Sequence, residues 1–88
     1  MADPLKNRDR FIQLGITIAA CRKYRGMTQN LLAEKAGLSR SYLSAIEAPN
    51  IVRPFSLEML FNIADALDVT PSHLLDTSMF PDDPTHSK

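Results

Sequence analysis

The chain has 88 residues, of which 44% are hydrophobic and 23% are charged, and its formal net charge is zero. This length allows one domain with one small core, and the single cysteine, Cys21, excludes an internal disulfide. We expect Cys21 to be a buried structural thiol and the protein to be cytoplasmic, because a lone thiol suits a reducing compartment. No apolar run approaches the ~20 residues of a membrane span, and Met1-Ala2-Asp3-Pro4 lacks a signal-peptide profile, so we expect no membrane association.

The N-terminal part predicts one long helix that begins at Asp3-Pro4 or at Asp9 and ends at Gly26. Its buried stripe repeats at helical spacing and comprises Leu14, Ile18 and Cys21. Further apolar residues either widen the core contact or lie in a subunit interface, namely Phe11, Ile12 and Ile16. The last turn carries cations that suit the negative end of the helix dipole, namely Arg22, Lys23 and Arg25.

The stretch Thr28–Glu47 predicts two short helices joined by a tight turn at Gly37, a residue that adopts a positive φ without strain. Thr28 and Ser39 have the hydroxyl side chains that N-cap such helices. Each helix has one apolar inner face, formed by Leu32, Ala33 and Ala36 in the first and by Leu43 and Ile46 in the second. This layout is that of a helix-turn-helix, whose second helix can enter the DNA major groove.

The C-terminal part predicts a loop over residues 48–54, a helix capped by Ser56 and a short helix that begins at Thr70-Pro71. The apolar positions that we expect in the core are Leu57, Leu60, Ile63, Ala64, Leu67, Leu74 and Leu75. Hydrophobic residues flank all four caps at the spacing of a hydrophobic staple, in the pairs Met27/Leu32, Leu38/Leu43, Phe55/Leu60 and Val69/Leu74. The predicted fold is therefore a compact all-α domain of five helices with a central helix-turn-helix and no strand.

We expect three segments: an N-terminal extension (1–8) in which the first helix could already start, a helix-turn-helix domain (9–76), and an acidic, disordered tail (77–88). The zero net charge conceals an asymmetry between the two parts of the chain. Residues 1–53 carry nine basic and four acidic groups, hence +5, whereas residues 54–88 carry one basic and six acidic groups, hence −5. The asymmetry indicates one phosphate-facing side, and the alternative is scattered, solvated charge.

From Leu14 to Leu75 the chain resembles the lambda-repressor-like (Cro/phage-repressor) class of helix-turn-helix domains. The residues that carry the resemblance are Arg22, Gly26–Gln29, Leu32–Ser39, Leu43, Ile46–Glu47, Ser56–Leu60, Ile63–Leu67, Val69–Pro71 and Leu74–Leu75. The resemblance implies a small transcriptional regulator, a repressor, that binds double-stranded DNA sequence-specifically with the helix Ser39–Glu47 in the major groove.

The resemblance also implies a role for individual residues. Base edges would be contacted from the outward face of the recognition helix by Arg40, Ser41, Ser44 and Ala45. Phosphates would be contacted by Thr28, Gln29, Arg22, Tyr42, Asn50 and Arg53. Gln29 would also brace the recognition helix. Some of these have alternatives: Arg40 either bridges a guanine or holds a phosphate, and Tyr42 either contacts phosphate or packs on the helix flank. Gln29 could instead be a solvated polar residue at a helix start.

Arg22 and Glu47 resemble the family's ion pair, which ties the first helix to the end of the recognition helix. Arg22 could hold this pair, a phosphate, or both. The family often has Asn-Gly after this glutamate, whereas this chain has Ala48-Pro49. The turn must therefore differ, and this weakens the assignment of Asn50.

We expect no cofactor, no metal site and no enzymatic activity, because His73 and His86 lack companion ligands and no nucleophile is paired with a base. The expected partners are double-stranded DNA and a second copy of the chain, because one small module offers only a small interface. The dimer surface would lie on the fourth and fifth helices or on the apolar N-terminal residues. Two alternatives are an antitoxin that binds a toxin through its acidic tail and a protein-interaction module that has lost DNA binding.

Overall fold

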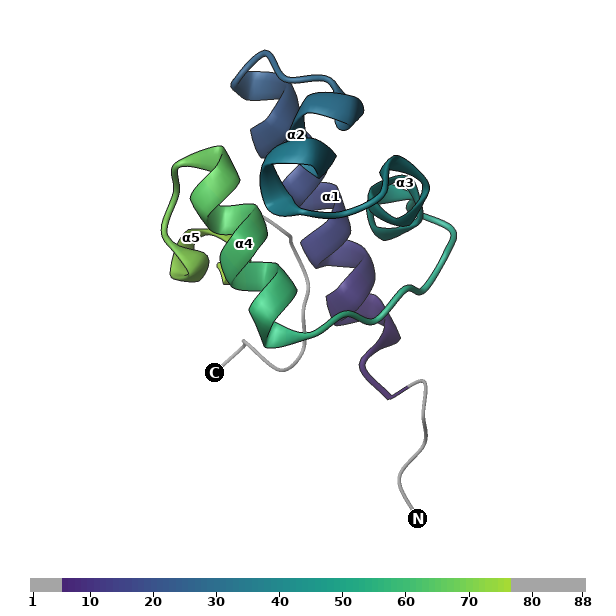
Figure 1. The fold of residues 1–88 in the computed structure, drawn as a ribbon. Helices are drawn as coiled ribbons and strands as arrows, with labels where there is room; N and C mark the ends of the chain where they lie inside the picture. Colours follow the sequence, from purple (N-terminus) through teal and green to yellow (C-terminus); the bar gives the residue numbers. More distant parts are fainter. Residues whose placement is uncertain (1–5, 77–88) are drawn as a thin grey trace.

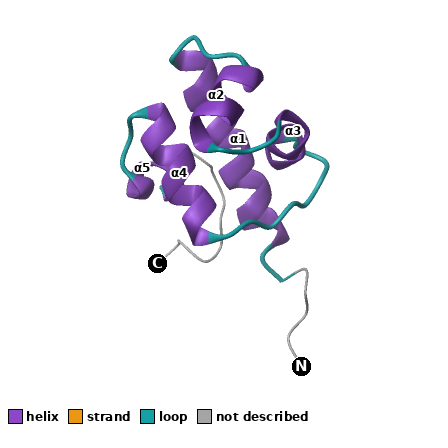
Figure 2. Cartoon of the chain, viewed as in Figure 1, coloured by secondary structure: helices purple, strands orange, loops and turns teal. Residues whose placement is uncertain are grey.

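The computed structural model describes residues 6–76. Within them five α-helices follow one another without a strand (Figure 2), which confirms the predicted all-α fold: α1 (Arg8–Tyr24), α2 (Gln29–Ala36), α3 (Arg40–Glu47), α4 (Leu57–Leu67) and α5 (Pro71–Leu75). The start of α1 lies next to the later of the two predicted starts, Asp9. The earlier start at Asp3-Pro4 and the predicted disordered tail lie outside the described residues. None of the helices between residues 6 and 76 has both the length and the apolar character that a bilayer crossing requires.

The four predicted caps are confirmed. The hydroxyl oxygens of Thr28, Ser39, Ser56 and Thr70 accept hydrogen bonds of 3.1–3.3 Å from the backbone amides of Leu31, Tyr42, Met59 and His73, respectively. Each bond satisfies an amide at a helix start that has no partner within the helix, which stabilises the helix by about 1 kcal/mol. By contrast α1 is preceded by Asn7, whose side chain makes no cap bond.

Three helices are followed by a residue in the left-handed region: Gly26 (φ 72°) two residues after α1, Gly37 (φ 74°) after α2 and Asp68 (φ 60°) after α4. The next residue in each case donates its amide to a carbonyl five positions back, in the pairs Met27–Arg22, Leu38–Ala33 and Val69–Ala64. The hydroxyl cap of the following helix comes directly afterwards. We call these three-residue connections, Gly26–Thr28, Gly37–Ser39 and Asp68–Thr70, the capping junctions. Each satisfies the end of one helix and the start of the next, so the angle between the two helices is defined.

The core is built where α1 and α2 pack against the other helices (Figure 1). Helix α1 contacts α3, α4 and α5, and helix α2 contacts α3 and α4. Figure 1 shows α3 and α5 on opposite sides of the bundle. The buried apolar side chains are Leu14, Ile18, Leu32, Ala33, Ala36, Leu43, Ile46, Leu60, Ile63, Ala64, Leu67 and Leu74. Nearly all of the predicted core is therefore confirmed.

Three apolar residues differ from the prediction. Leu57 and Leu75 were expected in the core but are 62% and 54% exposed. They are the first residue of α4 and the last of α5, where no further turn of the same helix helps to cover them. Cys21 is half-buried and packs against the core from its edge. Phe11 widens the core contact, since its ring meets that of Phe55 edge-on at 5.8 Å.

Candidate nucleic-acid interface

The outward face of α3 is formed by the four residues expected to contact bases. Arg40 and Ser41 are exposed and Ser44 and Ala45 are half-exposed, whereas Leu43 and Ile46 on the opposite face are buried. The Oγ atoms of Ser41 and the cap Ser39 lie 3.4 Å apart. Arg40 is therefore the one long hydrogen-bond donor on a face that otherwise carries short side chains.

Tyr42 joins α3 to the loop that follows it. Its hydroxyl donates to the carbonyl of Pro54 at 3.5 Å, and the guanidinium of Arg53 lies 4.7 Å from the centre of its ring. A cation at this distance over an aromatic face is attracted by the ring quadrupole. Tyr42 is half-buried and packs against the core, as one of its two predicted roles requires.

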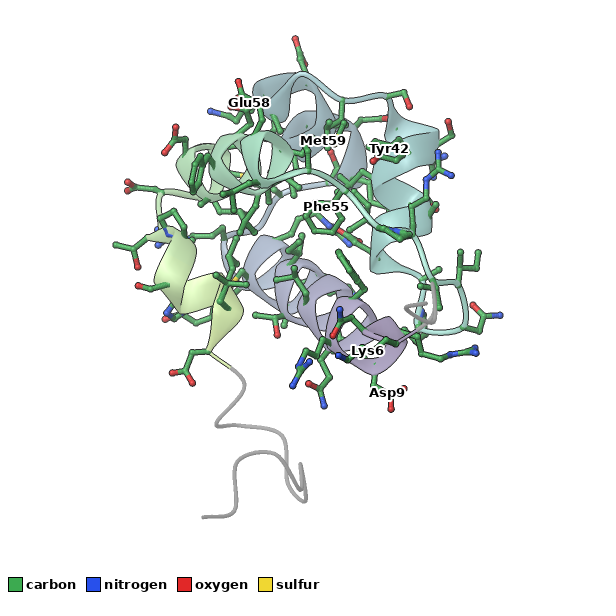
Figure 3. All side chains as sticks on the ribbon, turned by 90° about the horizontal axis from the view of Figure 1, so that it is seen from below. Lys6, Asp9, Tyr42, Phe55, Glu58 and Met59 are labelled. Atoms are coloured by element: carbon green, nitrogen blue, oxygen red, sulfur yellow. The ribbon has the colours of Figure 1, made fainter. Side chains whose placement is uncertain are left out.

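A shallow depression beside α3 joins Arg53 to the helix face. It has a volume of about 490 Å³ and is lined by Gly37, Leu38, Ser39, Ser41, Tyr42, Ala45, Arg53 and Met59. In Figure 3 Tyr42 and Met59 lie near each other at the edge of α3. The capping junction between α2 and α3, the outward face of α3 and the loop arginine therefore form one continuous surface.

The turn after α3 departs from the Asn-Gly pattern in the way that the sequence indicated. Ala48 adopts an extended conformation, and its carbonyl accepts the amide of Ile51 at 3.3 Å. This closes a turn with Pro49 and Asn50 at its two corner positions, which suits the fixed φ of proline. Asn50 is exposed at this corner.

Beneath this surface Glu47 connects three helices. Its Oε2 accepts the Nε of Arg22 at 2.8 Å, and its Oε1 accepts both Arg22 Nη2 at 3.0 Å and Gln29 Nε2 at 2.9 Å. Arg22 also donates through Nη1 to the carbonyl of Met27 at 2.8 Å. The side chains of Arg22 and Glu47 are 10% and 5% exposed, so the expected ion pair lies in the interior. It ties the end of α1, the start of α2 and the end of α3 together.

Gly15 was not recognised from the sequence as part of this arrangement. A Cβ atom at this position would overlap the carbonyl oxygen of Ile46 and lie 3.1 Å from its carbonyl carbon. The absence of a side chain allows α1 to cross the end of α3 at backbone contact. The only signal in the sequence was a glycine inside a helical pattern, which often marks a close approach of two backbones.

Comparison with known proteins places this geometry in a family. A helix-turn-helix family model matches residues 18–74, which include the whole α2–α3 unit and the ion pair. The chain belongs to the helix-turn-helix family. Its members include the HTH-type transcriptional regulator SinR of Bacillus subtilis, which is 41% identical over 63 residues. The matched region covers 72% of this chain and 56% of that regulator, so this chain matches only about half of its length.

Solved helix-turn-helix structures show the same arrangement. The restriction-modification controller protein C.AhdI from Aeromonas hydrophila superposes with a TM-score of 0.68 at 33% identity, over 73% of this chain and 94% of that one. The structure of SinR, the master regulator for biofilm formation, in complex with DNA superposes with a TM-score of 0.66 at 41% identity. That superposition covers 72% of this chain and 98% of the other. The likeness extends over the bundle and is not confined to the two central helices.

Proposed function

We propose that the protein is a transcriptional regulator that binds double-stranded DNA sequence-specifically, with α3 in the major groove. The observation that carries the proposal is the outward face of α3, formed by Arg40, Ser41, Ser44 and Ala45, on a helix that the Glu47 contacts hold in place. A relative with 41% identity has been solved in complex with DNA, which supports the same role here. Its action as a repressor and its cytoplasmic location are parts of this proposal.

In this proposal Arg40 is the principal base-contacting residue, because it alone on this face can donate two parallel hydrogen bonds to guanine. Arg53 contacts phosphate, and the ring of Tyr42 orients its guanidinium. Thr28 and Gln29 contribute phosphate contacts at the start of α2, where the helix dipole favours an anion. Asn50 contributes a further phosphate contact from the exposed turn after α3. We leave Arg22 out of the phosphate set, because it is buried and donates to Glu47 and Met27.

A second copy of the chain completes the proposed regulator. One module buries too little surface for tight specific binding, whereas two copies can occupy half-sites about 34 Å apart. Of the two candidate surfaces, α4 and α5 expose the larger apolar side chain, since Phe61 is 43% exposed. On α1, Ile16 is 38% exposed and Ile12 is half-buried. We therefore place the dimer contact on α4 around Phe61.

The salt dependence of duplex binding tests the proposal most directly. If about five phosphates are neutralised, the logarithm of affinity should fall against the logarithm of salt concentration with a slope near −4.5. Arg40→Ala should relax the preference at one operator position by about 1–3 kcal/mol. Arg53→Ala is the matched comparison, since loss of a phosphate contact weakens all sequences equally and reduces the slope by about one.

The same measurements separate the alternatives. A slope near zero would contradict DNA binding and favour a protein-interaction module. Equal weakening of all sequences by Arg40→Ala would make Arg40 a phosphate contact instead. An antitoxin would give the DNA results expected here and would also bind a toxin, so that hypothesis needs a separate binding partner to be found.

A further inference from the structure

An open apolar groove lies at the end of the bundle where α1 and α4 begin and α5 ends. Its volume is about 460 Å³, and it is lined mostly by Phe11, Leu14, Phe55, Leu57, Leu60 and Leu75. Leu57 and Leu75, the residues that the sequence placed wrongly in the core, form part of its wall. Covering such a surface with an apolar side chain removes it from water, which is favourable in proportion to the area covered.

Positive charge lies at one end of this groove. Arg10 is among its lining residues, and Lys6 and Arg8 lie within the same few residues at the start of α1. Asp9 is the acidic residue among them, so this end carries three cations and one anion. Figure 3 shows Lys6 and Asp9 together at the start of α1, below Phe55. A segment that combines apolar side chains with adjacent carboxylates would match both parts of the groove.

The chain itself contains such a segment directly after α5. Residues 77–88 include one large apolar pair, Met79-Phe80, followed closely by Asp82-Asp83. Phe80 is five residues beyond Leu75, so the chain can span at most about 18 Å between them. Leu75 already lines the groove, so the groove is within the reach of this short segment.

We propose that Met79-Phe80 occupies this groove in the same molecule, with Asp82-Asp83 beside the cations at the start of α1. A tether this short gives an effective concentration in the millimolar range, far above the concentration of a second copy at ordinary protein concentrations. The groove is thus a docking site for the chain's own acidic C-terminal segment. Phe61 on α4 lies outside the groove lining, and the proposed dimer contact remains separate from it.

A fluorescence experiment on the full chain tests this docking. The sequence has no tryptophan, so Phe80→Trp introduces a unique probe. We expect its emission to be shifted to shorter wavelength and protected from acrylamide, because the indole is held in an apolar site. Leu57→Glu in the same chain should abolish both the shift and the protection. Phe61→Glu, at another exposed position of the same helix that lies outside the groove, should leave them unaltered.

Further measurements keep the proposal open to refutation. Helix content of the Leu57→Glu chain is checked by circular dichroism, and Met79→Ser, which changes none of the groove's lining residues, offers a second way to weaken docking. Loss of the emission shift on dilution, or on Phe61→Glu, would show that a second copy covers the probe and would overturn the proposal. Emission like that of a solvated indole in the parent Phe80→Trp chain would overturn it as well.

Discussion

Gly15 determines how closely α1 approaches the recognition helix. Its Cα lies against the last turn of α3, where any Cβ would overlap the carbonyl oxygen of Ile46. The neighbouring Glu47 is the residue that receives Arg22 and Gln29. A single hydrogen atom in place of a side chain therefore keeps the ends of α1 and α3 close enough for these contacts.

Gly15→Ala should destabilise the protein by about 1–3 kcal/mol or more, because the added methyl group meets backbone that cannot move freely. Helix propensity alone predicts the opposite sign, since alanine is favoured over glycine by about 1 kcal/mol within a helix. Thermal or urea unfolding, monitored by circular dichroism, gives the sign of the change in the free energy of unfolding. As a control, Ala20→Gly on the exposed side of α1 should cost about 1 kcal/mol through propensity alone. A stabilising Gly15→Ala would contradict the close approach.

Asp68 is the one residue other than glycine with a positive φ among residues 6–76. The left-handed conformation costs a residue with a Cβ about 1–2 kcal/mol, and glycine avoids this cost while losing more chain entropy on folding. We therefore expect Asp68→Gly to raise stability by about 0.5–1 kcal/mol. Its backbone carbonyl, which accepts Arg25 Nη2 at 3.1 Å, is unaffected by the change.

Thermal unfolding measures this gain as a rise in Tm of a few degrees, since about 1 kcal/mol corresponds to about 4–8 °C in a domain of this size. Asp65→Gly is a matched control, because Asp65 is an exposed residue within the same helix. It should lower stability by about 1 kcal/mol. Equal losses from both changes would show that the left-handed position carries no strain.

At the scale of helices, the contacts of Glu47 fix the positions of α1, α2 and α3 relative to one another. The carboxylate accepts three hydrogen bonds and the guanidinium of Arg22 donates three. Such a buried pair is not strongly stabilising in itself, because desolvation offsets much of the attraction. Removing only one of the two charges is costly, because the other charge then stays buried without a partner.

Glu47→Gln should lower the free energy of unfolding by about 3 kcal/mol, because it leaves the positive charge of Arg22 uncompensated. The double change Arg22→Met/Glu47→Leu should be more stable than Glu47→Gln, since it removes both buried charges. Glu34→Gln on the exposed face of α2 serves as the control and should stay within about 0.5 kcal/mol of the parent. A double variant less stable than the single one would show that the pair is itself strongly favourable.

The helices could be predicted from the sequence because their ends are specified locally. A hydroxyl cap, a preceding hydrophobe and a glycine each act within one turn, and the starts of α2, α3, α4 and α5 were all predicted correctly. Periodicity identified the inner faces but failed at Leu57 and Leu75, where exposure depends on how far neighbouring helices extend. The bracing contact of Gln29 with the end of α3 was implied by the family resemblance, whereas the close approach of Gly15 joins residues distant in sequence, so no local pattern could reveal it.

At the scale of the whole molecule, the exposed Phe61 on α4 is the residue that we expect to join two copies. Phe61→Glu should prevent the proposed dimer from forming, because a carboxylate would be buried against its symmetry mate. Sedimentation analysis of the free protein measures the change, and binding to a full operator should weaken accordingly. Ile16→Glu tests the alternative surface on α1 and should leave the dimer intact. Dissociation by Ile16→Glu alone would move the interface to α1.

The capping junctions also determine where the chain can change in length. In each junction the first residue adopts the left-handed conformation, the second donates its amide to the preceding helix, and the third caps the next helix. An inserted residue would separate the end of one helix from the cap of the next and disturb both. The connection from α3 to α4, residues 48–56, is longer than the three-residue capping junctions and separates the end of α3 from the cap of α4 (Figure 1). Lengthening a loop of this kind costs only about 0.6 kcal/mol per doubling. Insertions, tags or grafted segments thus have one natural place between the helices, and it adjoins the recognition surface.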